Sequence, residues 1–161
     1  LLYASVNVSP KLGIFRPRWG FYYKQQFFNT RKYGASKALS RPLLLCLLDN
    51  NFALSETMNV AISLNAATPN ADGFLMRKSN YSVDLRFDKS FAKRTWIIYL
   101  SANDIFKTTK ERWTMYGQGS GTTKDCYNYT RSISLQVTYN FNAKRSKYKG
   151  TGAGNEEKSR L

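Results

Sequence analysis

The apolar and polar positions of the chain alternate with a period of two. In segment 131–141, apolar residues occupy the odd positions from Ile133 to Phe141 and polar residues the even positions between them. Such alternation predicts a strand with one apolar and one polar face. Segments 2–9, 57–66, 81–88 and 95–102 repeat the pattern, and 43–53 and 110–117 do so more weakly. Segment 14–28 is longer, and its Pro17 predicts an edge position, a bulge or a kink.

Turn-forming residues separate these segments. The breaks fall at 10–11, 30–40, 69–73, 89–94, 103–104 and 117–125. Together they define about eight strands joined by connections short enough for hairpins. The chain shows no convincing helical period, so an all-β sandwich or barrel is expected.

Three features favour a transmembrane barrel over a soluble sandwich. The alternating segments are long for soluble strands, which usually have about 5–6 residues, whereas a tilted membrane crossing needs about 9–11. The polar face of 81–88 carries the opposed charges Asp84, Arg86 and Asp88, which suit a lumen wall. Aromatic residues gather near the segment ends and suit a belt at the lipid headgroups. The predicted interfacial aromatics are Trp19, Phe21, Tyr23, Trp96 and Trp113.

Composition limits the chemistry of the chain. Its 161 residues include 25 Lys and Arg, 10 Asp and Glu and no histidine, for a formal net charge of +15. Without histidine the commonest general base and most zinc sites are missing, so an enzyme is not expected, and neither is a cofactor or metal. Residues 1–48 contain no acidic residue, whereas 49–141 are nearly balanced. The longest apolar run, Leu43–Leu48, is far too short for a membrane-spanning helix, which needs about 20 residues.

Within residues 94–141, Leu100–Phe106 combines the end of a predicted strand with the sequence Asn-Asp-Ile-Phe. This segment is similar to the turn that precedes the last hairpin of TonB-dependent-receptor-like outer-membrane β-barrels, and 94–141 as a whole resembles the C-terminal end of such barrels. The turn would be periplasmic by analogy. The hairpin would then comprise 110–117, a surface loop at 117–130, and 131–141. Segments 10–20 and 147–161 resemble a Bacteroidota-type outer membrane protein beta-barrel family.

The final strand also resembles the signal that the barrel-insertion machinery reads. The matching residues are Ser134, Tyr139 and Phe141, while Gln136 stands where the family usually has glycine. The resemblance implies a C-terminal portion of a larger barrel in the bacterial outer membrane. Residues 1–141 would form barrel strands and 142–161 a basic periplasmic tail. The implied partners are outer-membrane lipid, the insertion machinery, a small ligand of unknown identity and, through an absent N-terminal part, the TonB system; nucleic acid is not expected.

Other readings of the sequence stay open. A chain of about 160 residues also suits a complete eight-stranded barrel, and a basic aromatic β-domain could bind nucleic acid. The basic residues of 11–41 could bind phosphate-rich ligands such as lipopolysaccharide or nucleic acid, but the favoured explanation is that they lie at strand ends and reach into the lipid headgroups. Gly117–Lys124 lacks the spacing of a phosphate-binding loop and is expected to be a flexible hairpin loop. Cys46 and Cys126 are expected to remain unpaired thiols, because they are distant and differently placed in the sequence.

Overall fold

The computed structural model describes residues 1–141 except 28, 36–38 and 118–119, so the predicted tail 142–161 lies outside the described residues. The described part is built almost entirely of antiparallel strands, with two short 3-10 helices, η1 (Thr30–Tyr33) and η2 (Ala92–Arg94). The strands are β1 (Leu2–Val8), β2 (Phe15–Gln25), β3 (Leu43–Ser55), β4 (Met58–Ala67), β5 (Asn70–Asp72), β6 (Leu75–Arg77), β7 (Asn80–Phe91), β8 (Trp96–Asn103), β9 (Lys110–Tyr116), β10 (Gly121–Tyr127) and β11 (Ser132–Tyr139).

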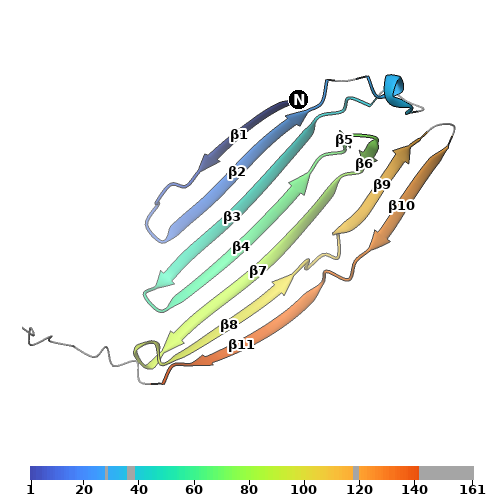
Figure 1. Cartoon of the computed structure of the whole chain (residues 1–161). Coiled ribbons are helices and arrows are strands. Elements are labelled where there is room, and N and C mark those ends of the chain that lie inside the picture. The colour runs from blue at the N-terminus through green and yellow to red at the C-terminus, as the bar shows by residue number, and fades with distance from the viewer. Residues whose placement is uncertain (28, 36–38, 118–119, 142–161) are drawn as a thin grey trace, which may run out of the picture.

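Seven strands form the main sheet, in the order β1-β2-β3-β4-β7-β8-β11 (Figure 1). Each neighbouring pair is antiparallel. The connections at 9–14, 56–57 and 92–95 are short and lie at one end of the sheet (Figure 1). This up-and-down arrangement is the topology that the period-two pattern and short breaks predict.

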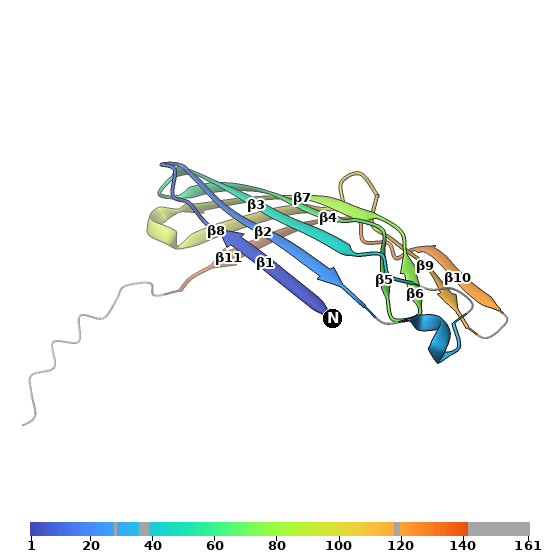
Figure 2. The ribbon, with the colours of Figure 1, turned by 90° about the horizontal axis from the view of Figure 1, so that it is seen from above.

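A second sheet, in the order β10-β9-β6-β5, extends from the opposite end of the main sheet. The hairpin of β4 with β7 continues into β5 with β6 without a change of register, since Ala67 pairs with Asn80 and Asn70 with Arg77. Strands β8 and β11 are separated from β9 and β10 by residues 104–109 and 128–131. Seen from above, the second sheet bends away from the main sheet (Figure 2).

The two faces of the main sheet differ in polarity. One row across the apolar face pairs Phe15, Phe52, Val60, Phe87, Leu100 and Leu135 in succession. Many apolar side chains on this face are exposed, among them Leu85 at 41% and Leu135 at 67% relative exposure. The buried apolar residues of the described part are few and small: Ala35, Leu39, Ala61 and Ala71. A water-soluble β-domain buries the apolar face of its sheet in a core, whereas this sheet leaves most of its apolar face exposed.

The sheet is open in the described part of the chain. Strand β1 pairs only with β2 and β11 only with β8, so each leaves one edge without a partner among the described residues. The expected all-β antiparallel arrangement is therefore present, but the expected barrel closure is not.

Several sequence predictions require correction. The described part contains three strands besides the eight that the sequence predicts, namely β5, β6 and β10, and seven of the eleven form the main sheet. The expected loop 117–130 contains β10, which the sequence pattern missed because residues 121–125 are polar on both faces. The turn predicted at Asn103–Phe106 is a break between β8 and β9, partway along the molecule, and does not lie with the short connections. The break expected at 69–73 contains β5. The predicted edge position of Pro17, by contrast, is confirmed at this residue. The pairing of β2 with β1 ends at Trp19, so at Pro17 the strand β2 pairs with β3 alone.

Candidate functional site

Charged and polar side chains form connected rows across the polar face of the main sheet. In the first row, Arg18 pairs with Asp49, Asp49 with Ser63 and Ser63 with Asp84. The guanidinium of Arg18 forms an ion pair with the Asp49 carboxylate, and Ser63 Oγ donates to Asp49 Oδ1 at 2.9 Å. The Asp84 carboxylate accepts the backbone N–H of Asp104 at 2.7 Å. Both carboxylates of this row are therefore satisfied by local donors.

The next row contains Arg16, Asn51, Ala61, Arg86, Ser101 and Ser134 in succession. The Arg86 guanidinium donates to Asn51 Oδ1 at the long distance of 3.5 Å, and the hydroxyls of Ser101 and Ser134 lie 2.6 Å apart. In the following row, Asn59 donates to the Asp88 carboxylate at 2.7 Å. Asp84, Arg86 and Asp88 thus share one polar face, each beside a different partner.

A buried aspartate holds the junction of the two sheets, at a position where the sequence pattern indicates only a break between strands. Asp104 is 2% exposed, with a positive φ of 45°. Its carboxylate accepts the backbone N–H groups of Thr108 (2.8 Å) and Thr109 (3.2 Å) and the Thr130 hydroxyl (2.6 Å). Burial by itself raises the pKa of Asp104, but the hydrogen bonds from Thr130, Thr108 and Thr109 outweigh it and lower the pKa to about 2. This carboxylate joins loop 104–109 to loop 128–131.

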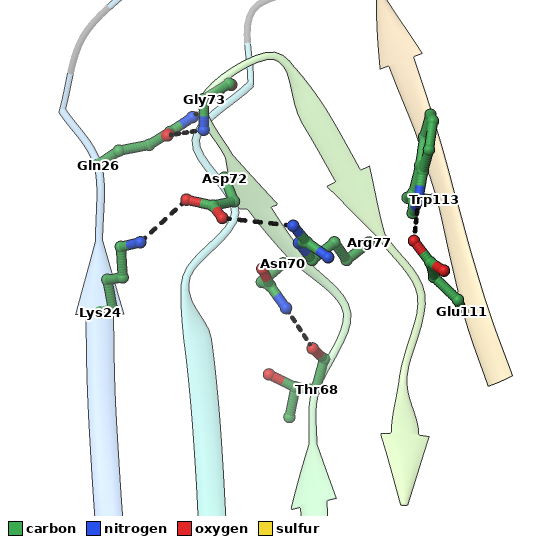
Figure 3. A network of polar contacts seen from close by, with 9 residues as sticks. All are labelled: Lys24, Gln26, Thr68, Asn70, Asp72, Gly73, Arg77, Glu111 and Trp113. Carbon is green, nitrogen blue, oxygen red and sulfur yellow. Dashed lines mark hydrogen bonds and ion pairs between the residues drawn. The ribbon is translucent and has the colours of Figure 1, made fainter. Parts of the chain in front are cut away.

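The second sheet carries its own polar network (Figure 3). Asp72 lies 2.9 Å from the ammonium of Lys24 and 3.7 Å from the guanidinium of Arg77. The Gln26 side chain accepts the Gly73 N–H at 2.9 Å and so ties the end of β2 to the β5–β6 turn. The contacts of Lys24 and Gln26 link segments that are 48 and 47 residues apart in the sequence, whereas Asp72 and Arg77 belong to the same hairpin.

Glu111 on β9 forms the second part of this network. It accepts Lys124 Nζ at 2.6 Å and the indole N–H of Trp113 at 2.9 Å. The hydrogen bond from Lys124, and to a smaller extent that from Trp113, lowers the pKa of Glu111 to about 2. The hydrogen bond to Glu111 in turn raises the pKa of Lys124. Glu111 therefore stays ionised, and β9 and β10 are joined by a charged pair.

The predicted interfacial aromatics occupy different positions. Trp19, Phe21 and Tyr23 follow one another at alternate positions of β2, so they extend about 13 Å along the strand. The Trp19 indole donates to Asn50 Oδ1 at 3.0 Å. Trp96 packs on Tyr139 with ring centroids 4.4 Å apart, at the short-connection end of the sheet. Trp113 lies in the second sheet.

The residues predicted as an assembly signal lie on and just beyond the edge strand β11. Ser134 and Gln136 are on its polar face, and Gln136 Nε2 donates to Thr138 Oγ1 at 3.5 Å. Tyr139 contacts Phe141 edge-to-face at 4.4 Å, and Phe141 is 81% exposed. The polar and aromatic members of the signal thus point to opposite faces.

Reactive groups are scarce in the described residues. Cys46 and Cys126 are both free, as their sequence settings predicted. Within residues 1–141 and outside the gaps at 28, 36–38 and 118–119, no group of three metal-ligating side chains occurs. No helix in the same residues is long and apolar enough to cross a membrane.

A wide antiparallel meander with one exposed apolar face and one hydrogen-bonded polar face is the arrangement found in the walls of outer-membrane β-barrels. Residues 2–139 match the outer membrane protein beta-barrel family, and the chain belongs to this family. Neither the curated proteins nor the solved structures contain a match to the chain.

Proposed function

We propose that the chain forms a wall segment of an outer-membrane receptor or transport barrel that takes up nutrients, with TonB-dependent energy coupling supplied by other parts of the protein. The observation that carries this proposal is the division of one seven-stranded meander into an exposed apolar face and a hydrogen-bonded polar face. The family match supports the outer membrane as its location. Uptake and energy coupling follow from the resemblance of 94–141 to TonB-dependent receptors.

The apolar face would contact lipid and the polar face would line the lumen. In this arrangement β3, β4 and β7 have a hydrogen-bonded neighbour on each side, as a membrane requires, and further strands would pair the free edges of β1 and β11. Strands β4 and β7 have 10 and 12 residues, which suits a tilted crossing of about 9–11 residues. The charges Asp84, Arg86 and Asp88 would then face the lumen, and Trp96, Tyr139 and Phe141 would meet the headgroups at one membrane surface.

The two ends of the main sheet would lie on opposite sides of the membrane. Outer-membrane barrels have short periplasmic turns and longer external loops. The short connections at 9–14, 56–57 and 92–95 would therefore be periplasmic, and the 26–42 connection and the second sheet external. Loop 104–109, with Asp104, lies outside the spanning strands in this arrangement.

Residues 1–141 do not close an antiparallel barrel by themselves, because their main sheet has an odd number of strands. Because seven strands alternate in direction, the edge strands β1 and β11 run parallel to each other. Direct pairing of β1 with β11 would break the antiparallel order of the family of barrels to which the chain belongs. A ring of copies related by rotation about the barrel axis would meet the same obstacle. An odd number of further strands, at least one, must then lie between β11 and β1.

We expect the complete polypeptide that contains this chain to fractionate with the outer membrane and to migrate differently on a gel before and after heating. Residues 1–161 expressed alone and refolded in detergent should aggregate without a heat-dependent shift, because the edges of β1 and β11 stay unpaired. A compact heat-sensitive monomer from residues 1–161 would support a complete small barrel instead. Uptake by the complete protein should stop when the proton-motive force is dissipated, and uptake that persists would contradict the energy coupling.

The proposed assembly signal gives a separate prediction. Tyr139→Ala removes ring contacts with both Trp96 and Phe141, each worth about 0.5–1.5 kcal/mol, and should lower the amount of heat-modifiable protein in the outer membrane. Gln136→Gly restores the residue that the family usually has there and should leave that amount equal or higher. Quantitative immunoblots of membrane fractions measure both, and equal losses in the two variants would contradict a sequence-specific signal.

A further inference from the structure

The polar face contains a cavity of about 410 Å³ near the short-connection end of the main sheet. Its charged lining residues are four cations and one carboxylate: Lys11, Arg16, Arg18, Arg86 and Asp88. Asn51 and Asn59 add amide groups. This excess of positive charge is local, since the main sheet also carries Asp49 and Asp84 on the same face.

The carboxylates near the cavity are already engaged. Asp88 accepts from Asn59, and Asp49 accepts from both Arg18 and Ser63. By contrast, the side chains of Arg16 and Lys11 have no hydrogen bond or ion pair within the described part of the chain. Arg86 has the 3.5 Å contact with Asn51 and a Coulombic attraction to Asp49. Donors of Arg16, Lys11 and Arg86 therefore remain available to a ligand, and Asp88 is the one carboxylate among the lining residues.

The strand register places two of these donors, Arg16 and Arg86, in the same row across the polar face. Arg16 on β2 and Arg86 on β7 belong to the same row and are separated by Asn51 and Ala61. Ala61 is 3% exposed, so neighbouring side chains cover its methyl group. Strands lie about 4.7–4.9 Å apart, so the two long side chains of Arg16 and Arg86 can reach one ligand group in the cavity from opposite sides. A planar guanidinium matches an oxyanion with two parallel N–H donors.

We propose that this cavity binds the phosphate or carboxylate group of a soluble solute in the barrel lumen, with Arg16 and Arg86 as the principal donors and Lys11 as an additional cation. The proposal rests on the proposed function, because the polar face must line a lumen for such a solute to reach it. A lipid headgroup is the less suitable source of the anion, since the apolar face that would contact lipid is on the other side of the sheet.

Calorimetric titration of the complete protein in detergent with inorganic pyrophosphate tests the site. Saturable binding is expected, and Arg16→Gln or Arg86→Gln should each weaken it about tenfold, the size of one lost charge-assisted interaction. Arg86→Lys should weaken it by less, because the charge stays while the paired donors are lost. Lys32→Gln, which removes one charge from the exposed helix η1, serves as the matched control and should leave binding unchanged.

Three results would overturn the proposal: no saturable binding, equal weakening by Lys32→Gln and Arg16→Gln, or pyrophosphate binding that anionic-lipid vesicles abolish by occupying the site. Only protein that shows the heat-dependent gel shift enters the titration. Loss of the gel shift in a variant indicates a folding defect, and its absence in the wild-type protein contradicts the proposed function. A normal gel shift without pyrophosphate binding contradicts the anion site alone.

Discussion

Replacing Asp104 by Ala is expected to release the β9–β10 hairpin from the main sheet. The substitution removes the acceptor for two backbone N–H groups and for the Thr130 hydroxyl inside a buried site, so these donors lose their partner without gaining water. The expected loss is about 3 kcal/mol in the free energy that opposes opening of the junction. Hydrogen exchange of the amides in β9 and β10, with the main sheet as internal reference, measures it.

The matched control is Asp125→Ala on β10, an exposed carboxylate in the same hairpin. It should change the free energy of opening, as measured by hydrogen exchange, by only a few tenths of a kcal/mol, as surface substitutions usually do. Asp104→Asn keeps one acceptor oxygen and should fall between the two. If Asp104→Ala and Asp125→Ala behave alike, the junction is held by other contacts, such as Lys107 over the ring of Tyr127.

The same carboxylate predicts a pH dependence of the junction. Its pKa is about 2 in the folded protein and 3.8 in the unfolded reference, so folding favours the ionised form. A depressed pKa adds stability above the unfolded value, and this stability is lost as the pH falls from about 4 to about 2. The protection of the hairpin amides, relative to their intrinsic exchange rates at each pH, should fall over that range in the wild type and should do so less in Asp104→Asn.

A cationic substitution on the apolar face is expected to block membrane insertion. Leu85 lies in the middle of β7, next to Ile62 and Ala102, on the face that we propose contacts lipid. Arginine on the lipid face of outer-membrane barrels costs about 2–4 kcal/mol at the bilayer midplane and less towards either membrane surface. Leu85→Arg should therefore lower the yield of heat-modifiable protein in lipid vesicles and in cells.

Ser82→Arg on the polar face of the same strand is the control, since its side chain would enter the proposed lumen. It should insert with a yield close to that of the wild type. The two variants also test the soluble alternative: an exposed arginine on a water-soluble sheet would raise solubility at either position. Equal insertion of Leu85→Arg and Ser82→Arg would contradict the assignment of the faces.

The period of two was sufficient to predict which residues share a face. Asp84, Arg86 and Asp88 lie together because side chains alternate along any strand, whatever its neighbours. The partners of these residues could not be predicted, because the pairing of Asn59 with Asp88 depends on the register between β4 and β7. Strand β10 was missed for a related reason. Its residues 121–125 are polar on both faces, and pairing with β9 rather than burial makes them a strand.

The sequence alone therefore determined the strand-rich class, the polarity of each face and the absence of histidine chemistry, because these depend on residue identity and local alternation. Only the tertiary structure decided the seven-strand order, the parallel direction of β1 and β11, and the burial of Asp104. Each of these depends on contacts between segments distant in the chain, which local alternation does not encode. Tertiary structure likewise placed Arg16 and Arg86 in one row, because the register across β2, β3, β4 and β7 brings them together.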